Sequence, residues 1–292
     1  MSRRGWVLFL SLSLIWGIPY LLIRICVESL SPAFIVWGRV ALAALVLLPI
    51  ALSRGEMKKL RGHYKGVLVF AVIEISITWP ALTYAEKQLT SSFTALIIAA
   101  VPLVGAVLAW RLGLDRLSGM RLVGLFVGIA GVAALVGLDF GQIDPLSVSV
   151  LIVTVFGYAF GPIVVTRYLS DLPSTAVITA AMLINVVLFA PFAWAFRPTT
   201  EVPATAWWSL VALGLLCTAF AFILFFALVA EVGPSRTTVI TYLNPMVALV
   251  LGVLVLSEPI TMGMIVGFPL VLLGSWLATR KGVPQESEPV PA

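Results

Sequence analysis

The chain has 292 residues, of which 61% are hydrophobic and 11% are charged, and its formal net charge is +5 at pH 7. Soluble domains carry about 25% charged residues, so a water-soluble fold cannot cover this much apolar surface. The composition predicts an integral membrane protein whose helices are solvated by lipid. The net charge is no evidence for a nucleic-acid partner, and none is expected.

Apolar runs of about 20 residues, the length that a helix needs to cross a bilayer, recur along the whole chain. The first run follows Arg3 and Arg4 and is too long for the apolar part of a signal peptide, so we interpret it as a retained helix. The last residues, 282–292, are rich in Pro and Glu and predict a disordered tail. Ten transmembrane helices are predicted, near residues 6–26, 33–52, 66–85, 91–110, 119–137, 146–167, 174–195, 206–229, 235–256 and 261–279.

The distribution of lysine and arginine between the loops sets the orientation of these helices. If the N-terminus is cytoplasmic, 14 of the 18 basic residues lie on the cytoplasmic side, and the acidic loop DFGQIDP lies outside. An even number of helices then places the C-terminus in the cytoplasm too. The predicted location is the inner (plasma) membrane, crossed many times.

The second half of the sequence repeats the first without gaps at an offset of 245 − 102 = 143 residues. The chain therefore divides into residues 1–141 and 142–281, with five helices each. Because five is odd, the second repeat enters the membrane in the opposite sense, as in the inverted repeats of many secondary transporters. The matched pairs include Pro19 with Pro162, Pro102 with Pro245, Asp115 with Glu258, Gly124 with Gly267 and Gly131 with Gly274.

Two segments, SRTTVITYLNPMVALVLGVLVLSEPITMGMIVGFPLVLLGSWLA and SSFTALIIAAVPLVGAVLAWRLGLDRLSGMRLVGLFVGIAG, resemble the EamA-type repeat of the drug/metabolite transporter superfamily. Both have a proline within a helix, an acidic residue, and then a helix with spaced glycines; Trp16-Gly17 and Arg39 also fit the family. The chain is most similar to YddG-type aromatic amino-acid exporters, which implies an amino acid as solute and export as direction. It departs from the pattern at Asp115, where the family usually has Glu, and at Arg39, whose repeat partner is Met182.

Of the prolines inside the predicted helices, five are hinge candidates, because each removes a backbone donor and frees the carbonyl four residues earlier. Free carbonyls at membrane depth are tolerated only against protein or in a wet cavity. The prolines are therefore either packing kinks satisfied by neighbours or hinges around a shared central cavity. The matching of Pro19 with Pro162 and of Pro102 with Pro245 between the repeats favours the second interpretation. The candidate hinge residues are Pro19, Pro80, Pro102, Pro162 and Pro245.

Aromatic and polar residues near these prolines are candidates for the lining of a substrate cavity, because such sites combine apolar walls with a few polar groups. The alternative is that the aromatic residues belong to the interfacial belts of the membrane. Asn244 is expected either to cap the broken turn near Thr241 or to contact the solute. The candidate cavity residues are Trp16, Trp79, Tyr84, Tyr158, Tyr242 and Asn244.

Two ionisable residues lie deep inside predicted helices, and such residues are functional candidates by default. Arg39 is in the second helix and Glu74 is in the third. Three interpretations remain open: Glu74 contacts Arg39, Glu74 is a protonatable coupling site, or Glu74 stays neutral because it is buried.

Small residues also repeat at a spacing of four, in Gly124-x-x-x-Gly128 and Gly263-x-x-x-Gly267. This spacing permits close approach of two helices, either between the two repeats or between two copies of the chain.

No catalytic or metal-binding pattern is found, and the single histidine, His63, has no Cys or His cluster around it. We therefore expect no enzyme activity, no cofactor, no metal and no obligate protein partner. The leading hypothesis is a secondary transporter that exports small amphipathic metabolites, including aromatic amino acids, by alternating access. A drug or other metabolite exporter of the same fold is the alternative, and a membrane enzyme or receptor is the alternative of a different class.

Overall fold

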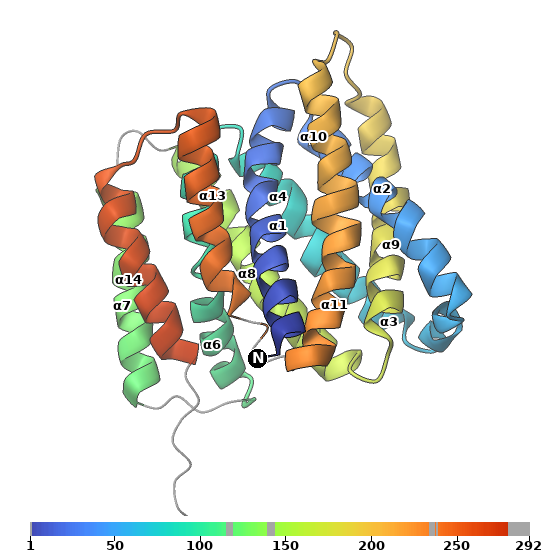
Figure 1. The fold of residues 1–292 in the computed structure, drawn as a ribbon, viewed down its shortest axis with the longest axis horizontal. Helices are drawn as coiled ribbons and strands as arrows, with labels where there is room; N and C mark the ends of the chain where they lie inside the picture. The colour runs from blue at the N-terminus through green and yellow to red at the C-terminus, as the bar shows by residue number, and fades with distance from the viewer. Residues whose placement is uncertain (1, 115–118, 139–143, 234–236, 238, 280–292) are drawn as a thin grey trace, which may run out of the picture.

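A computed structural model describes residues 2–114, 119–138, 144–233, 237 and 239–279. Within these ranges the chain forms helices and no strand (Figure 1). Nine described helical spans are long and apolar enough to cross a membrane, and one shorter apolar helix, Ile240–Leu256, accompanies them. The all-helical membrane architecture is thereby confirmed. The predicted tail and the predicted boundary between the repeats lie outside the described residues.

The helical elements follow the predicted spans to within three residues, apart from the start of the ninth span, which lies outside the described residues. In chain order they are α1 (Arg3–Val27), α2 (Pro32–Ser53), η1 (Glu56–Leu60), α3 (Tyr64–Ala71), η2 (Val72–Ile77), α4 (Thr78–Ala85), α5 (Ser91–Ile98), α6 (Val101–Arg111), α7 (Gly119–Gly137), α8 (Pro145–Tyr168), α9 (Ser174–Ala195), α10 (Ala204–Gly214), η3 (Leu215–Phe220), α11 (Ala221–Val232), α13 (Ile240–Leu256) and α14 (Met262–Thr279).

Several helices begin where a short polar side chain accepts a backbone N–H of the first turn, which satisfies a donor that the helix itself cannot. These caps are Ser2, Ser31, Thr90 and Asp144. Prolines at the first helical position, Pro32 and Pro145, follow two of the caps, where a missing donor costs nothing. Local sequence thus fixes the ends of these spans.

Two spans contain a π-helical segment, η2 between α3 and α4 and η3 between α10 and α11. The two segments start 215 − 72 = 143 residues apart and end 220 − 77 = 143 residues apart. This is the offset at which the sequence repeats. The start of α1 and the end of α14 also lie at the same end of the bundle (Figure 1).

Helices α7 and α14 lie side by side at one edge of the molecule (Figure 1). A Cβ atom on Gly131 would lie 2.5 Å from the backbone nitrogen of Val271, and one on Gly267 would lie 2.6 Å from the carbonyl oxygen of Gly131. A Cβ atom on Gly274 would meet the backbone of Gly128. The matched glycines therefore join the fifth and tenth spans within one chain, the first of the two arrangements expected from their spacing.

Helices from the two halves of the chain pack against each other. Helix α2 packs against α9, α10 and η3, and α9 packs against α2, α3 and η2. Large apolar side chains cover the outside, where Val187 is 76% exposed and Leu254 is 75% exposed. Such a surface suits lipid rather than water.

Candidate functional site

Arg39 is the most buried cation of the described residues, with 8% of the residue exposed, and it lies in the first half of α2. Its Nε–H donates to the Thr218 Oγ1 of η3 over 2.8 Å, and its Cζ lies 3.8 Å from the centroid of the Trp79 ring of α4. Thr218 in turn donates to the Leu213 carbonyl oxygen. The guanidinium is therefore held between an aromatic face and a hydroxyl.

Four more side chains lie close enough to Arg39 to interact with its charge. They are Tyr20 of α1, Tyr158 of α8, Cys217 of η3 and Glu86, which caps the end of α4. Neither tyrosine hydroxyl makes a hydrogen bond within the described ranges. Four elements from both halves of the chain thus bring polar groups to one cation.

Glu74 lies in η2 and does not form the ion pair with Arg39 that one interpretation of the sequence expected. The salt bridges of the described residues join Arg4 to Glu231 and Arg54 to Glu56. The Glu74 carboxyl instead packs against Gly161 of α8, where a Cβ atom would collide with Oε2. This Oε2 is buried without a hydrogen-bond partner in the described structure. Its helix turns the side chain towards α8, away from α2.

Asn185 of α9 is a polar core residue that the sequence did not single out. Its Nδ2 donates to the carbonyl oxygen of Ala71 over 3.3 Å, and its Oδ1 accepts from the Ser76 hydroxyl over 2.7 Å. The bond to Ala71 supplies a donor to the backbone where η2 begins, as the Thr218 hydroxyl does for the Leu213 carbonyl oxygen beside η3. An asparagine inside an apolar span is the sequence feature that could have identified this residue.

The other predicted cavity aromatics are spread over the bundle. Trp16 packs against the rings of Phe222 and Phe225, with centroids 5.9 and 5.2 Å away. Tyr158 is half-buried near Arg39, whereas Tyr84 is 40% exposed. The structure thus gathers Trp79 and Tyr158 around Arg39 and places Trp16 in a separate cluster on the α11 side.

Tyr242 and Asn244 of α13 both contact protein. The Tyr242 hydroxyl donates to the Ser275 carbonyl oxygen over 3.1 Å and lies 2.7 Å from Thr279 Oγ1. With its amide oriented for bonding, the Asn244 nitrogen lies 3.1 Å from the Ser13 carbonyl oxygen and 2.9 Å from that of Ile240. Of the two uses expected for Asn244, the structure favours bonding to the backbone of its own helix and of α1.

The five candidate hinge prolines differ in their effect on the backbone. Pro102 follows a break that separates α5 from α6, and the Ala99 carbonyl oxygen at this break accepts from Ser275 Oγ over 3.0 Å. Pro80 comes three residues after η2 ends. Inside continuous helices lie Pro19, Pro162 and Pro245.

Carboxylates join the two halves at both ends of α1. Where α1 ends, Glu258 accepts the backbone N–H groups of Ser91 and Ser92 over 2.7 and 2.9 Å, and Arg24 donates to the Glu86 carbonyl oxygen over 2.8 Å. Burial and then the neighbouring Glu258 raise the pKa of the Glu86 carboxyl well above its ordinary value, and Arg24 and Arg39 oppose this.

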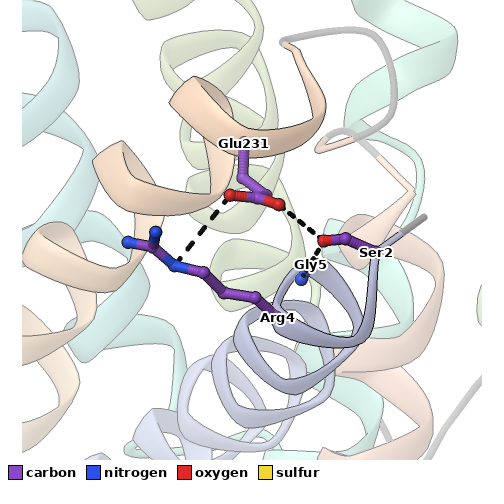
Figure 2. A network of polar contacts seen from close by, with 4 residues as sticks. All are labelled: Ser2, Arg4, Gly5 and Glu231. Atoms are coloured by element: carbon purple, nitrogen blue, oxygen red, sulfur yellow. Dashed lines mark hydrogen bonds and ion pairs between the residues drawn. The ribbon is translucent and has the colours of Figure 1, made fainter.

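Where α1 begins, Glu231 near the end of α11 accepts from the Ser2 hydroxyl over 2.5 Å (Figure 2). The same carboxylate lies 3.9 Å from Arg4 Nε. Ser2 also accepts the backbone N–H of Gly5, so one side chain both caps α1 and contacts α11. This network connects the first helix of the chain to its second half.

Comparison with known proteins places the chain among membrane transporters. YvbV, a transporter of Bacillus subtilis (strain 168), is 23% identical over 98% of this chain and 95% of the relative. YedA, an inner membrane transporter of Escherichia coli (strain K12), is 28% identical over 94% of this chain and 92% of the relative. A crystal structure at 19% identity, covering 96% of this chain and 97% of that one, has a TM-score of 0.68 and hence the same fold. The EamA-like transporter family matches residues 3–137 and again 145–280, so this chain belongs to that family.

Proposed function

We propose that the chain is a secondary transporter of the inner membrane that exports small amphipathic metabolites, amino acids and aromatic amino acids among them. The observation that carries the proposal is the repetition of the chain. The family matches each half separately, and the π-helical segments recur at the same offset of 143 residues as the prolines and glycines. Two inverted halves have two related arrangements, one open to each side, which is the basis of alternating access.

The predicted inverted topology is supported by the odd number of spans in each half. Five spans precede the start of α8 and five follow it, and the first and last helices have their ends on the same side of the bundle (Figure 1). The name of YedA, an inner membrane transporter, supports the inner membrane as the location. The bias of basic residues supports cytoplasmic termini.

The substrate class is supported by the surroundings of Arg39. An amphipathic solute needs apolar contact area and a small number of polar groups. Trp79 and Tyr158 supply aromatic surface beside one charged donor. This combination favours a solute with both an apolar and a charged part, such as an amino acid, over a purely apolar drug.

The test is counterflow in proteoliposomes that contain the purified chain, across a panel of the amino acids, with and without a pH gradient. We expect exchange of bulky apolar and aromatic amino acids. Exchange of cationic drugs without exchange of any amino acid supports the alternative of a drug exporter and contradicts the substrate assignment. Glu74→Gln then tests the coupling role of Glu74: loss of the response to the pH gradient identifies it as the coupling site, and an unchanged response excludes it. If the wild type itself shows no response to the gradient, the protein is a facilitator.

A further inference from the structure

Arg39 has more hydrogen-bond donors than partners. The guanidinium carries five N–H groups in a fixed planar fork. Its Nε–H donates to Thr218, but the four N–H groups on Nη1 and Nη2 make no hydrogen bond to the described parts of the chain. A charged residue at membrane depth costs about 2.5 kcal/mol or more, so an incompletely paired one needs an explanation.

The contacts of Arg39 fix the direction of this fork. Trp79 covers one face of the guanidinium at 3.8 Å, and Thr218 occupies its Nε. The Thr218 hydroxyl uses its own hydrogen on the Leu213 carbonyl oxygen, so it presents a lone pair to Arg39. The outer edge, formed by Nη1 and Nη2, is the part of the group that remains available. Two parallel N–H groups at such an edge match the two oxygens of a carboxylate.

The neighbouring groups favour an anion at this edge. The phenol groups of Tyr20 and Tyr158 lie within electrostatic range of Arg39, and neither hydroxyl makes a hydrogen bond to the described parts of the chain. The acidic neighbour within range is Glu86, whose buried carboxyl oxygens have no hydrogen-bond partner in the described structure and form no ion pair with Arg39. Donors thus outnumber acceptors around the cation.

We propose that the Nη1–Nη2 edge of Arg39 binds the carboxylate of the transported solute. Trp79 and Thr218 act as positioning residues that hold the guanidinium, while the solute's apolar part lies against the surrounding aromatic side chains. The assignment rests on the proposed transport function and narrows it to solutes that carry a carboxylate. Neutral amides and amines of the same shape are then poor ligands.

The test is ligand-induced thermal stabilisation of the purified, full-length protein, with probe pairs that differ only in the carboxyl group. The pairs are L-phenylalanine with L-phenylalaninamide and L-leucine with L-leucinamide. For at least one pair we expect the acid to bind about tenfold or more tightly than its amide. Equal binding of acid and amide in both pairs, or no binding of either acid, overturns the proposal. Equal stabilisation by sodium chloride at the same concentration also overturns it, because the site then accepts any anion.

Variants assign the effect to Arg39. In Arg39→Gln the preference for the acid is lost, and in Arg39→Lys binding weakens about tenfold because the fork is replaced by a point charge. The matched control is Arg197→Gln, because Arg197 also lies over a tryptophan, Trp194 at 4.4 Å, but is exposed. It should bind like the wild type. Thr218→Val keeps the charge and frees Nε; weaker binding with the acid preference retained supports the positioning role even if Arg39→Gln fails to fold.

The binding and counterflow experiments distinguish a failure of the carboxylate site from a failure of the proposed transport function. Acid-selective binding without counterflow leaves the carboxylate site standing and contradicts the transport function. Counterflow of amino acids and their amides at equal rates leaves the transport function standing and contradicts the carboxylate site.

Discussion

Glu86 makes the stability of the protein depend on pH. Burial and the neighbouring Glu258 raise its folded-state pKa well above the ordinary value, so the folded protein holds a proton that the unfolded chain releases. Stability is therefore greatest below the unfolded pKa and falls as the pH rises through the folded pKa. The loss is about 1.4 kcal/mol for each unit between the two pKa values.

Glu86→Gln should remove this fall, because the amide is neutral at every pH. We expect a higher unfolding temperature than that of the wild type at pH 8 and little difference at pH 4.5, measured by thermal unfolding in one detergent. Glu28→Gln is the control, since Glu28 is an exposed carboxyl at the end of α1. If the unfolding temperature of Glu86→Gln falls with pH as steeply as that of the wild type, the pH dependence belongs to another group.

Tyr242 joins α13 to α14. Its hydroxyl contacts the Ser275 carbonyl oxygen and Thr279 Oγ1, and hydrogen bonds between membrane helices contribute about 0.6 kcal/mol each. Tyr242→Phe should lower the free energy of unfolding by about 1 kcal/mol and leave the order of preferred amino acids unchanged in counterflow. If the order of preferred amino acids changes while the free energy of unfolding does not, Tyr242 lines the substrate cavity, as the sequence analysis predicts.

The charged residues inside the spans were predictable one by one, but their contacts were not. A cation or carboxylate inside an apolar span is visible in the sequence, and so Arg39 and Glu74 were identified. Their pairing depends on the rotation of each helix about its axis, which hydropathy does not determine. The structure turns Arg39 towards Trp79 and Thr218, and Glu74 towards Gly161. Thr218 and Asn185 have no such signal of charge, and their roles follow from the backbone that they contact.

At the scale of elements, hydropathy and caps predict where the spans lie, because each span must satisfy its backbone internally. Hydropathy does not reveal the π-helical segments η2 and η3 within these spans. A π-helical turn leaves the hydropathy unchanged and is stabilised by contacts from distant helices, such as Asn185 at η2. The repeat offset of 143 residues relates the two segments. It predicts the position of one π-helical segment only when the position of the other is known.

The contact between α7 and α14 depends on glycine at the crossing points. In Gly274→Ala the added methyl group meets the backbone of Gly128, which cannot move without separating the helices. We expect a loss of about 1–3 kcal/mol, typical of overpacking. Gly105→Ala is the matched control, because a Cβ atom on Gly105 of α6 meets nothing within 4 Å. That variant should gain about 0.5–1 kcal/mol from helix propensity, and equal unfolding temperatures of the two variants contradict the close contact.

At the scale of the whole molecule, the alternating access that we propose requires the two halves to separate at one end when they close at the other. The start of α1 and the end of α11 belong to different halves and meet through Ser2, Arg4 and Glu231 (Figure 2). The ion pair is exposed, 74% at Arg4 and 25% at Glu231, so it contributes about 0–1 kcal/mol and can break in each cycle. This end is thus suited to open and close.

A covalent bridge at this contact should stop transport. Ser2→Cys combined with Glu231→Cys places two thiols at the ends of α1 and α11, and a short bifunctional thiol reagent can join them. The natural Cys26 and Cys217 are fully buried and do not compete. We expect counterflow to fall to background after bridging, while each single-cysteine variant treated with the same reagent keeps its rate. Full exchange by the bridged protein means that the halves do not separate at this end, and the movement then has to be sought where Glu258 contacts Ser91 and Ser92.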